Sequence, residues 1–100
     1  MKLERCARVI RSKNAGPTLL TIDILFDDEP AFETARASPR LTEAVVAARY
    51  GLAPHEVRIV AYAPAHAIKI VLDRRLIAGA PGDRDVYGAQ QHGPLLDLEL

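Results

Sequence analysis

The chain has 100 residues, 49% of them apolar and 26% charged, which predicts a single globular domain over residues 1–100. Thirteen Lys and Arg residues balance thirteen Asp and Glu residues, and this zero net charge argues against a nucleic-acid partner, because such binders need a basic excess. No apolar run approaches the roughly 18–20 residues of a membrane helix, so we expect no membrane contact.

The N-terminal region is expected to contain a strand and then a loop. Charged residues stand where the apolar stretch of a signal peptide would begin, and the single cysteine excludes an internal disulfide, so we expect a cytoplasmic protein. Residues 5–11 alternate loosely and predict the first strand, with Cys6 as a small buried hydrophobe. Residues 12–17 include Gly16 and Pro17 and predict the loop.

Residues 18–26 form the clearest predicted strand, because successive side chains point to opposite faces and divide into two distinct sets. One set is uniformly apolar and is expected to form the core: Leu20, Ile22, Ile24 and Phe26. The other set is mixed, and mixed faces are where ligands or partners dock: Leu19, Thr21, Asp23 and Leu25.

A helix is predicted over residues 29–37. Asp27 and Asp28 are both candidate N-caps, and Pro30 falls in the first turn, where its missing N–H costs no hydrogen bond. Pro39 follows the segment and is expected to end the helix.

A second helix is predicted over residues 41–50, with Thr42 as the candidate N-cap. Its apolar stripe follows the i, i+4, i+7 spacing of an amphipathic helix: Leu41, Val45 and Ala48. Gly51 is expected to adopt the left-handed C-terminal cap, with Leu52 as the hydrophobic contact that follows it.

The C-terminal half predicts further strands. Residues 56–63 and 67–72 are expected to pair as an antiparallel hairpin through a turn at residues 64–66. A short helical turn over residues 84–91 and a closing strand over residues 95–100 complete the prediction. This order predicts the α+β class, as a ferredoxin-like two-layer sandwich with a mostly antiparallel sheet and the helices on one face.

A polar cluster lies between the first two predicted strands. Cationic groups, a hydroxyl, an amide and loop N–H groups are the ingredients of an anion site: Arg11, Ser12, Lys13, Asn14 and Gly16. The alternative is an ordinary solvated polar turn. In the adjacent strand, Asp23 shares a face with Thr21 and is expected to pair with Arg11 or Lys13, or to lie on an open sheet face.

A second polar cluster spans residues 82–93. Side chains with many hydrogen-bond donors and acceptors follow one another there: Asp83, Arg84, Asp85, Tyr87, Gln90, Gln91 and His92. His92 could act as a general acid or base near neutral pH, and the alternative is a solvated or structural histidine. The sequence lacks the spacing of metal-ligating residues, because His55, His66 and His92 are far apart. We therefore expect no metal and no cofactor.

Both clusters lie in stretches that carry a family resemblance. The segments 9–28 and 81–97 resemble a family of bacterial proteins of about this length, which is catalogued as a domain of unknown function. Its members are usually encoded beside, or fused to, a larger protein of the acyclic-terpene-utilisation (AtuA) type. A looser similarity extends to the ferredoxin-like C-terminal domain of AtuA-type proteins, whose Arg-Ser-Gly-Asp-Lys-Gly-like loop corresponds to residues 11–16 in a different residue order.

This resemblance implies a small subunit in a hetero-oligomer with an AtuA-type large protein. The shared site would bind a small organic acid or its CoA thioester, and hydration or dehydration by a hydro-lyase is the expected reaction. Arg11 and Lys13 would hold the carboxylate, while Asp23 or His92 would move the proton. The alternative is a ferredoxin-like module that binds an anionic metabolite without chemistry, or a structural subunit.

Overall fold

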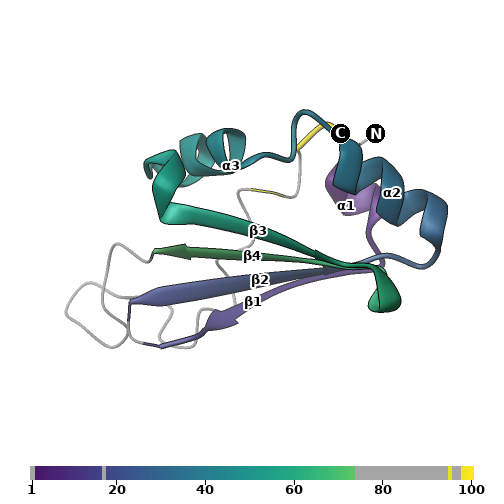
Figure 1. Ribbon diagram of the computed structural model, residues 1–100, viewed down its shortest axis with the longest axis horizontal. Coiled ribbons are helices and arrows are strands. Elements are labelled where there is room, and N and C mark those ends of the chain that lie inside the picture. Colours follow the sequence, from purple (N-terminus) through teal and green to yellow (C-terminus); the bar gives the residue numbers. More distant parts are fainter. Residues whose placement is uncertain (1, 17, 74–94, 96–97) are drawn as a thin grey trace.

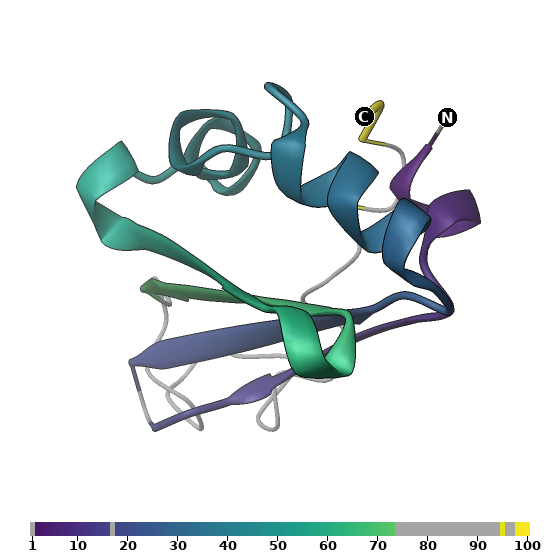
Figure 2. The same cartoon turned by 45° about the vertical axis from the view of Figure 1, so that its right-hand side comes forward.

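A computed structural model describes residues 2–16, 18–73, 95 and 98–100. Four strands form one antiparallel sheet in the order β1-β2-β4-β3. Figures 1 and 2 show the helices on one side of this sheet, which makes two layers. The elements are α1 (Leu3–Cys6), β1 (Val9–Asn14), β2 (Leu19–Leu25), α2 (Glu29–Ala37), α3 (Glu43–Tyr50), the 3-10 turn η1 (Pro54–Glu56), β3 (Val57–Tyr62), the 3-10 turn η2 (Ala63–Ala65) and β4 (Ala67–Asp73).

The predicted α+β class and the placement of the helices on one face are confirmed. The strands are connected as two hairpins, β1–β2 and β3–β4, with α2 and α3 between them. The two hairpins join through the β2–β4 pair, in which Ile22 faces Ile70. The two-layer sandwich is therefore built from hairpins, whereas a ferredoxin-like chain alternates strands and helices as βαββαβ.

The core fills the space between the sheet and the helices. The predicted core face of β2 is confirmed, because Leu20, Ile22, Ile24 and the following Phe26 are at most 2% exposed. Alternate residues of β4 extend this surface, and side chains from the helix layer and from both ends of the described chain close over it: Leu3, Phe32, Ala35, Leu41, Val46, Ala47, Leu95 and Leu98. Burial of these apolar side chains is the main stabilising contribution.

The predicted helix signals act as expected. The side chain of Asp28 accepts a hydrogen bond from the N–H of Ala31 at 2.9 Å and caps α2, so Asp28 and not Asp27 is the N-cap. Thr42 caps α3 in the same way, and its helix begins at Glu43 rather than at residue 41. Gly51 has φ +67° and closes α3 in the left-handed conformation.

Three local predictions are wrong. The first strand does not begin at residue 5, because residues 3–6 form α1, where Cys6 is half-buried. Residues 12–14 are not a loop, since β1 continues to Asn14 opposite β2. The third is wrong in part: the buried residues of α3 are Val46 and Ala47, whereas in the predicted stripe Leu41 is buried, Val45 is partly buried against the core and Ala48 is exposed.

The C-terminal end also departs from the prediction. Of residues 95–100, those that the structure describes form no strand beyond a single β-bridge between Glu99 and Lys2. The N–H of Leu3 donates to the carbonyl of Leu98 at 2.8 Å, which fixes this end beside α1. The predicted helical turn over residues 84–91 lies outside the described residues. Among the described helices, none is long and apolar enough to cross a membrane.

Candidate functional site

The sheet face turned away from the helices carries most of the predicted site residues that the structure describes. We call it the outer sheet face. Its members follow from the strand register and from the alternation of side chains along each strand: Val9, Arg11, Lys13, Leu19, Thr21, Asp23, Leu25, Arg58, Val60, Tyr62, Ala67, Lys69, Val71 and Asp73. Four of these are cations and two are carboxylates. The outer sheet face is therefore net cationic in the part of the chain that the structure describes.

One row across this face places a carboxylate between two cations. Asp23 on β2 pairs in register with Arg11 on β1 and with Lys69 on β4. Arg11 Nε lies 3.9 Å from Asp23 Oδ2, so of the alternatives expected for Asp23 the structure shows the pair with Arg11. The Arg11 side chain is 68% exposed and that of Asp23 is 21% exposed. An exposed pair at this distance is weak, on the order of 1 kcal/mol or less, so it leaves Arg11 available to a ligand.

The neighbouring row contributes two further cations. Lys13, Thr21, Val71 and Arg58 lie side by side across β1, β2, β4 and β3. The Thr21 hydroxyl donates to the Lys13 backbone carbonyl at 3.3 Å, so Thr21 is buried and its hydroxyl supports the β1–β2 pairing. Of the four outer-face cations, Arg11 alone forms an ion pair within the described part of the chain.

The outer sheet face also gathers exposed apolar side chains. Among the described residues, the large apolar side chains that remain exposed are Leu19 at 38%, Val60 at 47% and Tyr62 at 59%. All three lie on this face, on β2 and β3. Exposed apolar groups beside cations are typical of a surface that contacts a partner or a ligand with an apolar part.

The structure divides the first predicted polar cluster between the two faces of the sheet. Because residues 12–14 lie in β1, their side chains alternate, and Arg11 and Lys13 project to the outer sheet face. Ser12 and Asn14 fall on the helix side, where Ser12 is buried opposite Ile22. Gly16 follows the strand with φ +151°, a conformation that favours glycine.

The second predicted cluster, Asp83 to His92, lies outside the described residues. Two outer-face cations, Arg58 and Lys69, were not selected from the sequence. Their signal was the alternation within the two C-terminal strands, which places Lys69 on the polar side of a run whose other side is aliphatic. The register that sets Lys69 beside Asp23 joins residues 46 positions apart, which no local pattern indicates.

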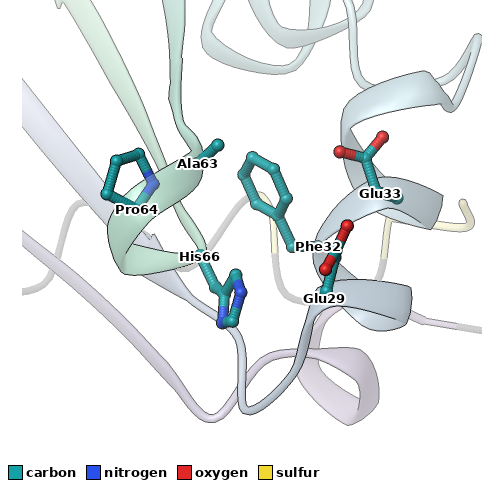
Figure 3. A pocket seen from close by; sticks show the side chains of 6 residues that line it. All are labelled: Glu29, Phe32, Glu33, Ala63, Pro64 and His66. Carbon is teal, nitrogen blue, oxygen red and sulfur yellow. The ribbon is translucent and has the colours of Figure 1, made fainter.

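A second candidate site is a pocket between α2 and the turn that joins β3 to β4. Its volume is about 300 Å³, and its lining consists of Glu29, Phe32, Glu33, Ala63, Pro64 and His66. Figure 3 shows Glu29 and Glu33 on α2, the Phe32 ring projecting toward the turn, and the His66 imidazole on the turn. The ring centroids of Phe32 and His66 are 6.0 Å apart.

His66 is held in place by its backbone. It has φ +49°, which is uncommon outside glycine. Its N–H donates to the carbonyl of Ala63 at 3.0 Å, and its carbonyl accepts a hydrogen bond from the N–H of Phe26 at 2.9 Å. In the same pocket, Glu33 accepts hydrogen bonds from Arg36, and this contact lowers the pKa of Glu33. The pocket is thus acidic, which disfavours an anionic ligand there. Sequence reasoning treated His66 only as a turn residue.

The described residues offer no ready metal site. No group of three or more His, Cys, Asp or Glu side chains there is arranged to hold a metal ion. Every buried side-chain nitrogen or oxygen atom in these parts of the chain has a hydrogen-bond partner. The chemistry of the described sites therefore comes from charged groups at the surface and not from an unpaired buried polar group.

Comparison with known proteins identifies the family without an activity. No curated protein matches the sequence, and no solved structure matches the fold. A family described as a domain of unknown function, DUF4387, matches residues 3–99, which is nearly the whole chain. This chain belongs to the DUF4387 family.

Proposed function

We propose that this chain is the small subunit of a two-component complex with an AtuA-type large protein, in which it completes a site for a small organic acid or its CoA thioester. Hydration or dehydration of that substrate is the reaction we assign to the complex. The observation that supports the proposal is the outer sheet face, where four cations accompany the exposed side chains of Leu19, Val60 and Tyr62.

The cations supply the binding chemistry. The four cations form two pairs: Arg11 and Lys13 lie two residues apart on β1, and Lys69 on β4 is the diagonal neighbour of Arg58 on β3. Residues at i and i+2 of one strand, and diagonal neighbours on paired strands, lie roughly 7 Å apart, which suits a carboxylate or phosphate held by both cations of one pair. An arginine guanidinium can bind such a group through two parallel hydrogen bonds.

Asp23 is the candidate for proton transfer in the described part of the site. Its carboxylate lies between Arg11 and Lys69 in register and is only 21% exposed. A bound anion would compete with Asp23 for Arg11, which would free the carboxylate to accept a proton from the substrate. His92 and Lys13 remain candidates for the same step. The candidates for contacts with the substrate in the second cluster are Asp83, Arg84, Asp85, Tyr87, Gln90 and Gln91.

Co-purification of the untagged large protein with the tagged chain tests the complex. We expect a stable complex and turnover that neither chain shows alone. Arg11→Ala, Lys13→Ala, Asp23→Asn and His92→Ala should each lower turnover at least tenfold while the complex still forms. Arg40→Ala is the matched control, because Arg40 is an exposed cation between α2 and α3 and should leave turnover unchanged.

Three outcomes would contradict the proposal. Full turnover in all four site variants would remove the site assignment. Tight binding of an organic acid by the isolated chain, without a complex, would instead favour an anion-binding module that performs no chemistry. Complex formation with turnover that Arg40→Ala lowers as much as Arg11→Ala would show a general charge effect.

A further inference from the structure

Among the strands that the structure describes, β3 forms an edge of the sheet and carries few of the residues that usually protect an edge. It pairs with β4 on one side, and no described strand pairs with its other side. Natural edge strands are commonly protected by charged residues, proline or bulges against pairing with another chain. The opposite edge, β1, carries Arg11 and Lys13, whereas β3 reads Val-Arg-Ile-Val-Ala-Tyr with a single charge. The β3 edge is therefore the better suited to add a strand.

The residues of β3 on the outer sheet face are arranged symmetrically. Arg58 and Tyr62 each lie two positions from Val60, on the same face of the strand. An antiparallel copy of β3 centred on Val60 would place the two Val60 side chains opposite each other. It would also place Arg58 of each copy opposite Tyr62 of the other, and a guanidinium against a tyrosine ring is an attractive cation–π contact.

Other alignments lose this complementarity. Pairing centred on Arg58 sets two guanidinium groups opposite each other, and like charges directly across a strand pair are destabilising. Pairing centred on Ile59 sets Arg58 opposite Val60 and Tyr62 opposite Glu56, with no cation–π contact. Only the alignment on Val60 forms the Arg58–Tyr62 contact twice.

We propose that β3 pairs antiparallel with β3 of a second copy of this chain, centred on Val60. The sheet then continues across both copies, and the two outer sheet faces become one surface, since Val60 at 47% and Tyr62 at 59% exposure come to lie at the junction. This inference does not depend on the proposed function, because it rests on the edge strand alone.

Disulfide trapping tests the alignment directly. The native cysteine is first removed by Cys6→Ser, and Val60→Cys is then added. Opposite residues of antiparallel strands have Cα atoms about 4.5–5.5 Å apart, within the range that a disulfide spans. Leu19→Cys in the same background is the control, because Leu19 is exposed on the same sheet face but lies on β2, so that its two copies would be roughly 24 Å apart across the joined sheet. We expect covalent dimer from Val60→Cys and none from Leu19→Cys.

Sedimentation equilibrium tests the interaction without a cross-link. Val60→Lys should raise the dimer dissociation constant at least tenfold, because it sets two ammonium groups opposite each other. Leu19→Lys is the matched control, since Leu19 is exposed on the same sheet face but lies on β2, and it should leave dimerisation unchanged. Arg58→Ala and Tyr62→Ala should each weaken the dimer roughly five- to thirtyfold, since each removes two contacts.

Each contrary result would overturn the proposal. A chain that stays monomeric at millimolar concentration has no β3–β3 contact. Equal trapping of Val60→Cys and Leu19→Cys would indicate random collision. A dimer that Leu19→Lys disrupts and Val60→Lys does not would use the outer sheet face itself rather than the strand edge.

Discussion

The two faces of the sheet are built from the same strands and differ in almost every property. The helix-covered face is aliphatic, and Ile22, Ile24 and Ile70 are fully buried there. The outer sheet face carries four cations, two carboxylates and three exposed apolar side chains. Residues that determine stability and residues available for binding therefore alternate along each strand. Substitutions at adjacent positions should separate the two roles.

The largest expected effect comes from the covered face. Ile70→Ala should lower the free energy of unfolding by about 2–5 kcal/mol, because it leaves a cavity in the core. Lys69→Ala, one residue away on the outer sheet face, should change it by less than about 0.5 kcal/mol. Urea denaturation of both variants measures the difference. A similar loss of unfolding free energy in the two variants would show that the two faces contribute alike to stability.

A smaller effect is expected at Thr21, the buried polar residue of the outer sheet face. Thr21→Val keeps the side-chain shape and removes the hydroxyl that donates to Lys13, so stability should fall by about 0.5–1.5 kcal/mol. Thr18→Val is the control, since Thr18 is exposed just before β2. If Thr18→Val destabilises as much, the hydrogen bond is not the cause.

The ion pair on the outer sheet face should contribute still less. Arg11→Ala and Asp23→Asn should each change the free energy of unfolding by less than about 1 kcal/mol, because the pair is 3.9 Å apart and Arg11 is 68% exposed. A double-mutant cycle gives the coupling between them. A coupling above about 2 kcal/mol would assign this pair to the fold and weaken its assignment to binding.

Removal of the Tyr50 hydroxyl should have the smallest effect on the free energy of unfolding at neutral pH and a larger effect at alkaline pH. It ends α3 and packs half-buried against the core, and burial raises the pKa of its phenol. The folded state favours the neutral phenol. Its contribution to the free energy of unfolding is therefore complete below the pKa of about 10 that tyrosine has in the unfolded chain, and this contribution is lost as the pH rises above that value. Stability should therefore fall less steeply above pH 10 in Tyr50→Phe than in the unmodified chain. Tyr62→Phe, which removes an exposed phenol from the outer sheet face, is the control, and the same flattening there would refute a role of burial.

Sequence reasoning located the elements whose signals are local. The alternation of residues 18–26 predicted β2 and its buried side, and Asp28, Thr42 and Gly51 marked the helix ends. Residues 12–14 were misassigned because Ser, Lys and Asn have weak strand preference. They join β1 only because β2 continues opposite them as far as Leu19.

The remaining differences depend on tertiary contacts. Val46 and Ala47 are buried more deeply than Val45, and Ala48 is exposed, because docking on the sheet, and not helical periodicity alone, selects the face of α3. The Arg11–Asp23 pair was predictable from neighbouring strands. The presence of Lys69 and Arg58 on the same surface could not be predicted, because it depends on the register between distant hairpins.

The two ends of the described chain meet beside α1. Lys2 forms a β-bridge with Glu99, and Figure 1 shows both ends on the helix side of the sheet, away from the outer sheet face. Ends this close permit circular permutation, in which a short linker joins them and the chain is opened elsewhere. The exposed turn at Gly51 is a suitable opening point, because it lies between the two halves of the sheet in sequence. In the permuted protein a label or a fused domain could be attached at the new ends near Gly51, and every cation of the outer sheet face would stay in place.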